Sequence, residues 1–523
     1  MPDTPHRHVT RRTVLTAALA LAGTGALSAW STAPAAAAGL RAYDEPYRPQ
    51  VHFSPARNWM NDPNGLLHHN GTYHLFFQYN PSGNTWGNMS WGHATSPDLV
   101  HWEERPVAIA HDDEEMVFSG SAVFDRDNTS GLGTTAAPPL VAVYTSMVKA
   151  TGRQRQSLAY STDDGETWTR YAGNPVLDIG SNDFRDPKVF WHAPTDRWVM
   201  AVAMAAEHRI RFYASPDLKT WTYLSDFGPS GATGGVWECP DLFELPVDGA
   251  SGRRRWVLIV NLNPGGPAGG SAGQYFTGDF DGTTFTADPQ DGPRWLDHGA
   301  DAYAGVTYND APGGRRVLVA WMNNWLYGEK IPTDPWRSAM GFPRELGLRS
   351  AAGGGVALVQ RPVAELATLR RRPALRLSGR RVRAGTAARL LRDVGQTYEV
   401  EAVLRPDGAK RCGLEVRTGG GHRTRIGYDS GGEVYVDRTA SGDVGFAAEF
   451  PAVHRAPLAL TDGVLRLRVL VDRSSVEVYA GDGTVCLTDQ IFPGEDATGL
   501  GAFAEEGGLR IERLTVWPLR SAW

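Results

Sequence analysis

Apolar and polar residues alternate along most of the chain, and one strand–turn–strand pattern recurs in its N-terminal part. The segment WGHATSPDLVHW ends at Trp102, SLAYSTDDGETW at Trp168, RFYASPDLKTW at Trp221, and a weaker fourth copy, QYFTGDFDGTTF, at Phe285. Each copy places an apolar strand before a turn of Ser, Asp or Gly, and the next strand begins with an aromatic residue. The spacing is somewhat longer than the roughly 40–50 residues of common propeller repeats.

Repeats of this kind predict four-stranded antiparallel sheets arranged as blades around an axis. We expect a further blade from residues 303–307 and 316–321, where apolar strand patterns return. Residues 45–360 are therefore predicted to form a β-propeller of about five blades. An array of β-sandwiches is the alternative that the repeats alone leave open.

The pattern changes after Arg361-Pro362. Val363, Leu366 and Leu369 keep a helical period, and Arg-rich sequence continues to Arg383, so we predict a linker over residues 361–383. Strict alternation then resumes, for example at Leu465, Leu467, Val469 and Val471. The length of this strand-only region predicts a C-terminal β-sandwich over residues 384–523.

The N-terminus carries the features of an export signal. Arg11-Arg12 precede an apolar run from Val14 to about Trp30, and Ala36-Ala37-Ala38 offer the small residues of a cleavage site. The run is shorter than the ~20 residues of a membrane-spanning helix. We therefore predict a twin-arginine signal peptide over residues 1–38 and a secreted protein without membrane contact after cleavage; a retained anchor is the alternative.

Cysteine content and charge narrow the class of protein. The three cysteines, Cys239, Cys412 and Cys486, are too scattered to indicate a disulfide framework or a metal site, although a Cys412–Cys486 bridge stays open. The formal net charge is −6 and no long basic run occurs, which argues against a nucleic-acid partner. We expect neither a metal nor another cofactor.

Three carboxylates stand next to prolines at wide intervals along the chain. They occur in Asn61-Asp62-Pro63-Asn64-Gly65, in Arg185-Asp186-Pro187 and in Trp237-Glu238-Cys239-Pro240. A proline fixes its own φ and restricts the residue before it, so each motif holds a carboxylate in a defined backbone position. Taken singly, the motifs are also compatible with a hairpin turn, a buried Arg–Asp pair and a surface glutamate.

Together the three motifs resemble the NDPNG, RDP and ECP motifs of glycoside hydrolase family 32, the retaining fructosidases. The resemblance extends over nearly the whole chain after the signal region, including Pro335 to Leu346 and the stretch Val471 to Gly483. It implies a five-bladed β-propeller followed by a C-terminal β-sandwich. It also implies that Asp62 is the nucleophile, Glu238 the general acid/base and Asp186 the stabiliser of the transition state.

The residue types agree with these implied roles. A covalent glycosidase mechanism needs one ionised carboxylate and one carboxyl group that can donate a proton. Turn N–H groups and Asn61 favour the charged form of Asp62, whereas the apolar neighbours Trp237 and Cys239 would raise the pKa of Glu238. Further positions match the family's fructosyl pocket, and they comprise Asn61, Gln78, Trp86, Phe118, Ser119, Arg185, Asp301, Tyr303 and Trp325.

The sequence thus predicts a secreted, exo-acting β-fructosidase that releases fructose from levan or inulin, either as the polysaccharide or as fructo-oligosaccharides. Sucrose is a candidate lesser substrate. A fructosyltransferase and a levanbiose-releasing levanase are alternatives, since the covalent intermediate allows other acceptors and outer loops set the cleavage pattern. Two further rivals are a sialidase-type hydrolase, suggested by the Asp-box-like Ser161 to Trp168, and a non-catalytic sugar-binding propeller.

Overall fold

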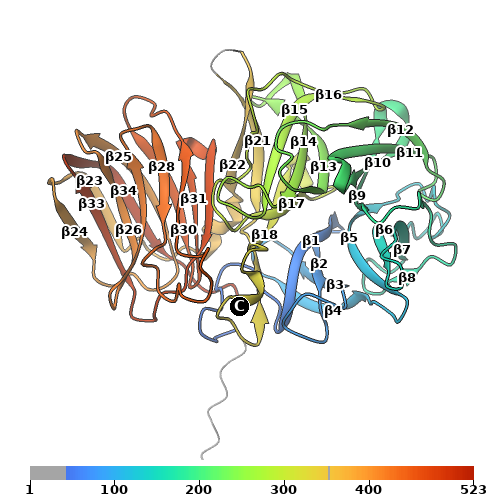
Figure 1. Cartoon of the computed structure of the whole chain (residues 1–523), viewed down its shortest axis with the longest axis horizontal. Coiled ribbons are helices and arrows are strands. Elements are labelled where there is room, and N and C mark those ends of the chain that lie inside the picture. The colour runs from blue at the N-terminus through green and yellow to red at the C-terminus, as the bar shows by residue number, and fades with distance from the viewer. Residues whose placement is uncertain (1–42, 352–353) are drawn as a thin grey trace, which may run out of the picture. The chain divides into compact units, whose positions relative to one another are not determined.

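The computed structural model describes residues 43–351 and 354–523, and the predicted signal peptide lies outside this range. The described chain is built of strands arranged in six sheets (Figure 1), which confirms the all-β prediction. The helical elements are short 3-10 turns: η1 (Ala193–Thr195), η2 (Ala205–Glu207), η3 (Pro312–Gly314), η4 (Gly328–Lys330), η5 (Ala364–Leu369) and η6 (Gly481–Gly483). Within the described residues, no helix has the length and apolarity needed to cross a membrane.

The N-terminal domain contains four sheets that follow the chain order. The first joins β1 (Asn58–His69), β2 (Thr72–Tyr79), β3 (Ser90–Ser96) and β4 (Glu103–Ile109), with the short β19 (Trp336–Arg337) at its edge. The second joins β5 (Glu115–Phe124), β6 (Leu140–Val148), β7 (Gln154–Ser161) and β8 (Thr169–Arg170). The third joins β9 (Phe184–His192), β10 (Arg197–Met204), β11 (Arg209–Ser215) and β12 (Thr222–Phe227).

The fourth sheet has nine strands. Its members are β13 (Val236–Val247), β14 (Ala250–Asn263), β15 (Ala272–Phe280), β16 (Phe285–Ala287), β17 (Tyr303–Thr307), β18 (Val317–Met322), β20 (Ala339–Met340), β21 (Arg344–Ser350) and β22 (Val356–Pro362). A single parallel pair, Val247 with Leu348, joins β13 to β21. All other strand pairs of this sheet are antiparallel.

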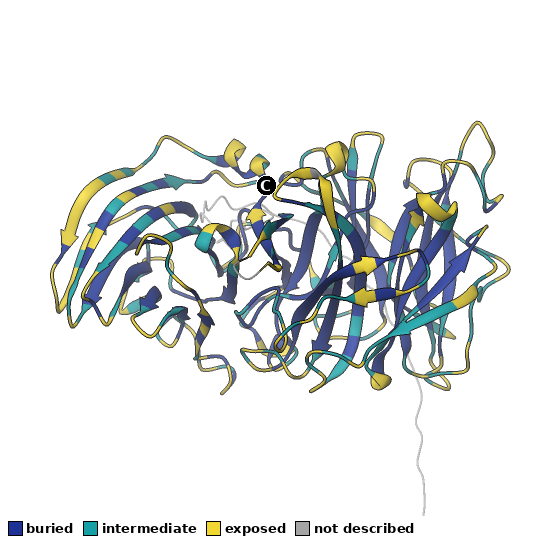
Figure 2. Ribbon diagram, turned by 90° about the horizontal axis from the view of Figure 1, so that it is seen from above, coloured by how far each residue is buried: buried dark blue, intermediate teal, exposed yellow. Residues whose placement is uncertain are grey.

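Five strands from these sheets contact one another in a closed cycle. β1 contacts β5, β5 contacts β9, β9 contacts β13, β13 contacts β17, and β17 contacts β1. We call these five the ring strands. Apolar side chains fill the space between neighbouring sheets; for example, Val143, Phe184 and Met200 belong to one buried cluster. Figure 2 shows the same distribution, with buried residues along the strands and exposed residues mainly in the turns.

The repeated turns seen in the sequence share one hydrogen-bonding scheme. The Asp98 carboxylate accepts the backbone N–H groups of Val100 and His101, at 3.0 and 2.9 Å, between β3 and β4. Asp217 closes the turn between β11 and β12 in the same way, and Asp163 accepts the N–H of Thr167 between β7 and β8. The turns at Asp98 and Asp217 are Asx-type turns, whereas Asp163 accepts from a residue four positions later. The aspartates of the repeats therefore stabilise hairpins.

The C-terminal domain is a β-sandwich, as predicted. One six-stranded sheet contains β23 (Leu375–Val382), β34 (Gly508–Pro518), β25 (Tyr398–Asp407), β30 (Leu465–Val471), β31 (Ser475–Ala480) and β32 (Val485–Gln490). The other contains β24 (Thr386–Leu391), β33 (Gly499–Glu505), β26 (Arg411–Gly419), β27 (His422–Asp429), β28 (Glu433–Asp437) and β29 (Val453–Pro457). A single apolar cluster, including Val400, Leu414 and Leu467, lies between them.

The segment 361–383, expected as a linker, contains the 3-10 helix η5 and then β23. β23 pairs with β34 from Leu375 to Val382 and is therefore a strand of the C-terminal sandwich. Five of its eight residues are exposed to solvent, four of them from Ser378 to Arg381. An edge strand with so little apolar pattern gives no strand signal in the sequence.

A buried network of charged side chains connects the two domains. His52 contacts Asp472 through Nδ1 at 2.8 Å and Glu477 through Nε2 at 2.9 Å. Arg344 bridges Glu477, at 3.0 Å, and Asp297, at 2.9 Å. All five side chains are at most 4 % exposed. Buried charges are tolerated when they are paired and hydrogen-bonded in this way, and removal of one partner is costly.

We expect the stability of the protein to fall at alkaline pH because of His52. Burial opposes its charge, but the hydrogen bonds that His52 donates to the Asp472 and Glu477 carboxylates outweigh burial and raise the pKa of His52 to about 9. A group whose pKa is higher in the folded state than in the unfolded state stabilises the folded protein. For His52 this contribution is complete below the unfolded-state pKa, near 6.5, and is lost as pH rises through about 9. The contribution is on the order of 3 kcal/mol.

Thermal unfolding between pH 6 and pH 10 measures this effect. The midpoint of the wild-type protein should decrease between about pH 7 and pH 10, whereas His52→Gln, which does not titrate, should start lower and change less. Equal decreases in both proteins would contradict the assignment.

Candidate active site

Each of the five ring strands contains a β-bulge. Two residues of the ring strand oppose one residue of its partner in every case. The pairs are Asn61 and Asp62 opposite Gln78, Phe118 and Ser119 opposite Thr145, Asp186 and Pro187 opposite Val202, Cys239 and Pro240 opposite Val260, and Ala304 and Gly305 opposite Ala320. Bulges bend a strand and re-aim its side chains, and they are frequent beside functional sites.

The backbone at three of these bulges has an unusual conformation. Asp186, Cys239 and Ala304, the first residues of their bulges, have φ values of 65°, 43° and 53°. Non-glycine residues rarely adopt positive φ, and they do so where the surrounding structure enforces it. Pro187 and Pro240 follow directly, at positions where a missing N–H group interrupts no regular ladder. This explains why a proline is tolerated after Asp186 and after Cys239.

The bulges bring the carboxylates of Asp62 and Asp186 to one side chain, that of Cys239. The Cys239 thiol lies 3.5 Å from Asp62 Oδ2 and 3.6 Å from Asp186 Oδ2. The backbone N–H of Cys239 also donates to Asp186 Oδ2 at 2.9 Å. Residues far apart in the sequence therefore form one compact group around Cys239.

Asp62 is oriented by two hydrogen-bond donors. The Ser119 hydroxyl donates to Oδ2 at 2.7 Å, and the Asn61 amide donates to Oδ1 at 3.0 Å. Asn61 is itself fixed by the indole N–H of Trp59, at 2.8 Å. Two of the predicted pocket residues, Asn61 and Ser119, thus contact the predicted nucleophile directly.

Glu238 accepts hydrogen bonds from Arg185 Nε, at 3.0 Å, and from the Tyr303 hydroxyl. The apolar setting expected for this residue is not found. Successive side chains of a strand point to opposite faces, so Trp237 points away from Glu238. Its indole N–H donates to the carbonyl of Ala232. The Glu238 side chain is 21 % exposed. Its surroundings are polar and partly open to solvent.

Asp186 is the most buried of the three carboxylates. Burial raises its pKa, the negative charge of Glu238 adds to this effect, Arg185 opposes it, and Asp62 raises the pKa further. The Asp186 backbone N–H donates to Thr145 Oγ1 at 3.0 Å. The Arg185 guanidinium donates a hydrogen bond to Glu238. Its positive charge also lowers the pKa of Asp186 and so opposes the effect of burial.

Aromatic residues surround the carboxylates. Trp325 lies beside Trp59 and Trp321, with ring centroids 5.6 and 5.0 Å apart. Trp86 is 41 % exposed, and its ring approaches that of Phe118 edge-on at 6.1 Å. These three predicted pocket residues, Trp86, Phe118 and Trp325, therefore offer apolar faces next to polar groups.

Two predicted residues have other roles. Gln78 is buried and joins β1 to β5 by donating to Asn64 Oδ1 and to the Val117 carbonyl, at 2.8 and 3.1 Å. Asp301, expected in the pocket, is fully buried and faces the C-terminal domain. Its carboxylate accepts hydrogen bonds from Arg438 at 2.7 Å and Tyr327 at 2.8 Å. Arg438 is 137 residues downstream, and the local sequence around Asp301 gives no sign of it.

Sequence analysis missed Cys239 as a member of the site. All three cysteines are buried free thiols, and no Cys412–Cys486 bridge forms. Burial and the neighbouring carboxylates raise the pKa of the Cys239 thiol, so it stays protonated and can donate. Glu329 was also missed; its carboxylate accepts the backbone N–H of the exposed Trp86 at 3.0 Å. The only sequence signal was the position of Cys239 directly after Glu238.

The chain is similar to known proteins along most of its length. The family model described as the glycosyl hydrolases family 32 N-terminal domain matches residues 52–362, and the family 32 C-terminal model matches residues 365–518. A levanase of Bacillus subtilis (strain 168) is 48 % identical over 496 residues, which cover 92 % of this chain and 72 % of the relative.

Fungal and yeast relatives are similar along nearly their whole length. An extracellular exo-inulinase of Aspergillus awamori is 44 % identical over 519 residues, covering 92 % of this chain and 96 % of the relative. The crystal structure of the exo-inulinase from this organism matches with a TM-score of 0.88. A β-fructofuranosidase from Schwanniomyces occidentalis, complexed with fructosyl-erythritol, is 33 % identical, covers 92 % of this chain and 99 % of its own, and has a TM-score of 0.83.

Proposed function

The chain belongs to glycosyl hydrolase family 32, and from this premise we propose that it is a secreted, exo-acting β-fructosidase that releases fructose from levan or inulin, with sucrose as a lesser substrate. The relatives named levanase and exo-inulinase support the fructan substrate. The observation that carries the proposal is the convergence of Asp62, Asp186 and Glu238, through Cys239 and Arg185, into one group.

In the proposed mechanism, Asp62 attacks the anomeric carbon and Glu238 protonates the departing oxygen. The fructosyl–Asp62 ester is then hydrolysed by a water molecule that Glu238 deprotonates, which retains the configuration. Ser119 and Asn61 hold the Asp62 carboxylate in one orientation for this attack. Arg185 and Tyr303 position Glu238 from two sides. No cofactor is needed.

Asp186 is assigned to the sugar hydroxyls. A carboxylate that accepts two hydroxyl hydrogen bonds stabilises the positive charge that develops on the ring in the transition state. Its one backbone donor, the N–H of Cys239, leaves further acceptor capacity for such hydroxyls. The aromatic faces of Trp86 and Trp325 supply apolar contacts to the C–H surfaces of the sugar.

The fold that supports this site is inferred to be a five-bladed propeller over residues 45–360, followed by a short connector that contains η5 and by a sandwich that begins with β23 and extends to residue 523. Two observations support five blades. The ring strands contact one another in a closed cycle, and each has a bulge of the same two-against-one type. The nine-stranded sheet divides naturally into two blades at the single parallel pair between β13 and β21.

Export by the twin-arginine route is part of the proposal. The relative from Aspergillus awamori is described as extracellular. The buried free thiols agree with a protein that folds before export and does not depend on disulfide formation. The partner of the exported protein is then its polysaccharide or fructo-oligosaccharide substrate.

The alternatives differ in how well the site supports them. Asp163 of the Asp-box-like segment is occupied in a hairpin turn, so this segment does not argue for a sialidase. A non-catalytic propeller would not need three converging carboxylates. Transfer to a sugar acceptor uses the same covalent intermediate as hydrolysis, so a fructosyltransferase is the second candidate function.

Replacing the two proposed catalytic carboxyls should have different consequences. Asp62→Asn removes the nucleophile and should lower kcat by on the order of 10⁴-fold or more. Glu238→Gln should lower kcat by about 10²–10⁴-fold on natural fructans. It should recover much of that loss on an aryl β-fructofuranoside, whose leaving group needs no proton.

Steady-state kinetics and thermal unfolding on the same samples separate chemistry from folding. Asp279→Asn is the matched control, since this carboxylate is 73 % exposed on β15 and should change neither measurement. Near-native activity of Asp62→Asn on levan would refute its assignment as nucleophile.

Analysis of the reaction products tests the hypothesis that the enzyme acts at chain ends and releases fructose. Chromatography of early reaction products from levan, inulin and sucrose should show free fructose as the main product at every time point. Early accumulation of levanbiose or of longer oligosaccharides would contradict exo-action and monosaccharide release, and it would leave the carboxyl assignments intact. Fructose transferred to added sugar acceptors would favour the fructosyltransferase.

A further inference from the structure

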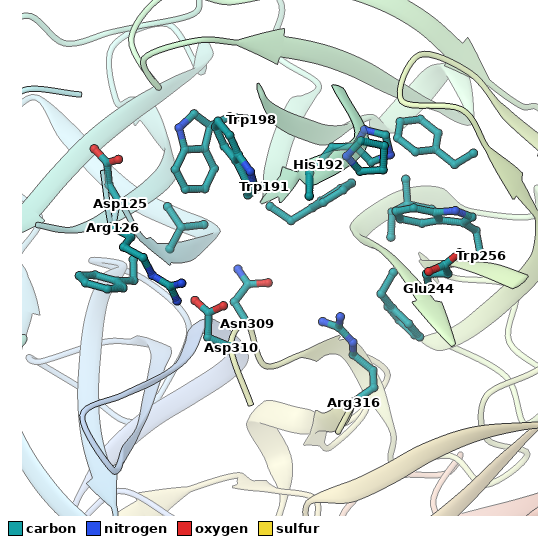
Figure 3. Close-up of a pocket in the computed structure, with 18 of the residues that line it drawn as sticks. Asp125, Arg126, Trp191, His192, Trp198, Glu244, Trp256, Asn309, Asp310 and Arg316 are labelled. Carbon is teal, nitrogen blue, oxygen red and sulfur yellow. The ribbon is translucent and has the colours of Figure 1, made fainter. Parts of the chain in front are cut away.

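A large cavity lies away from the catalytic carboxylates. It has a volume of about 760 Å³, and none of Asp62, Asp186 and Glu238 lines it. The space among the residues near Asp186 and Cys239 is far smaller, about 20 Å³. Figure 3 shows Trp191, Trp198 and His192 along one side of the large cavity and Asn309, Asp310 and Arg316 along the opposite side.

The cavity is at the other end of the ring strands from the candidate active site. On β9, Asp186 is near the start of the strand and His192 is its last residue; on β13, Glu238 is followed six residues later by Glu244. Six residues of a strand span roughly 20 Å. The same strands that position the carboxylates therefore line this second cavity with their later residues.

A layer of buried polar side chains separates the two regions. Lys188 pairs with Asp241 at 3.3 Å and donates to the Thr307 carbonyl at 2.6 Å. Asn309 donates to the carbonyls of Ala122 and Val189, at 2.8 and 3.0 Å. These contacts join β5, β9 and β13 with β17 and the residues that follow it, so the cavity is a site of its own and not the depth of the active site.

The lining combines aromatic faces with polar groups. Trp191 is 37 % exposed, an unusual exposure for so large an apolar side chain, and it packs edge-on against Trp198 at 5.0 Å. Trp256 packs against Phe190 and Phe280, at 5.9 and 5.2 Å. Ligand sites of about 300–1,000 Å³ are characteristically lined by such aromatic residues together with a few polar groups.

Two charged lining residues have unused hydrogen-bonding capacity. Across residues 43–351 and 354–523, the Arg126 guanidinium and the Asp310 carboxylate form no hydrogen bond or ion pair with another side chain or with the backbone. Arg126 lies over the Phe124 ring, 6.0 Å from its centroid. Both residues also line a neighbouring cavity of about 560 Å³, so the two spaces adjoin. A ligand with several units could extend from one into the other.

We propose that this cavity is a second, non-catalytic binding site for the same neutral polysaccharide, a segment of the fructan substrate; the inference rests on the proposed function. Sugar rings present C–H faces that suit Trp191 and Trp256. Their hydroxyls match the free donors of Arg126 and the free acceptors of Asp310. A site of this kind holds the polymer on the enzyme while chain ends reach the carboxylates, which raises their effective concentration.

Binding stoichiometry tests the proposal. The Asp62→Asn chain, which does not consume the ligand, should bind two molecules of an inulin-type fructo-oligosaccharide in isothermal titration calorimetry. Adding Trp191→Ala, or separately Arg126→Ala, should abolish one of the two or weaken it about five- to tenfold. Arg126 is exposed, so Arg126→Ala keeps the test valid if Trp191→Ala fails to fold. Tyr223→Ala, an aromatic residue 53 % exposed outside the cavity, is the matched control.

Kinetic measurements on cavity variants that keep Asp62 distinguish a failure of the second binding site from a failure of the proposed function. Trp191→Ala and Arg126→Ala should raise KM for levan polymer about five- to tenfold and leave kcat and KM for sucrose unchanged. One binding event in Asp62→Asn, or unaltered levan affinity in both cavity variants, would overturn the second site while levan hydrolysis by the wild-type protein still stands. Absence of any fructan hydrolysis by the wild-type protein would overturn the proposed function instead.

Discussion

The two-against-one bulge in each ring strand is the constraint on which the site depends. A regular strand would direct alternate side chains to opposite faces, and the three carboxylates would not converge. The bulges of β1, β9 and β13 place the carboxylates of Asp62 and Asp186 within hydrogen-bonding distance of the Cys239 thiol. The positive φ of Asp186 and Cys239 is the conformational cost of this arrangement.

Electrostatics within the site follows from this convergence. Three carboxylates close together repel one another, and burial adds to the cost of keeping them charged. Arg185 offsets part of this cost at Glu238, and the Cys239 N–H and thiol contact Asp186. Buried carboxylates at the domain interface are also paired with cations. There Arg344 and His52 balance the charges of Asp297, Glu477 and Asp472. Charged side chains are buried in both places, and in the active site Asp186 keeps acceptor capacity for the sugar hydroxyls of the proposed substrate.

Local patterns in the sequence predicted much of the fold and part of the site. Hairpin repeats, alternation and the proline-linked motifs indicated an all-β chain, a C-terminal sandwich and the contact of Asn61 with Asp62, and the family resemblance placed Ser119 in the same pocket. Features that depend on distant partners were not accessible. Asp301 is neutralised by Arg438, Glu238 is surrounded by Arg185 and Tyr303, and β23 is defined by pairing with β34. None of these partners is near its counterpart in the sequence.

The central claim is that Asp62 and Glu238 act in a double-displacement mechanism, and the configuration of the first product tests it most directly. NMR spectra recorded within the first turnovers on a fructan, before the released sugar mutarotates, distinguish the two anomers. The account predicts that fructose first appears as the β-anomer, because two successive inversions restore the starting configuration. Initial release of the α-anomer would contradict a covalent intermediate on Asp62 and would require a single displacement by water.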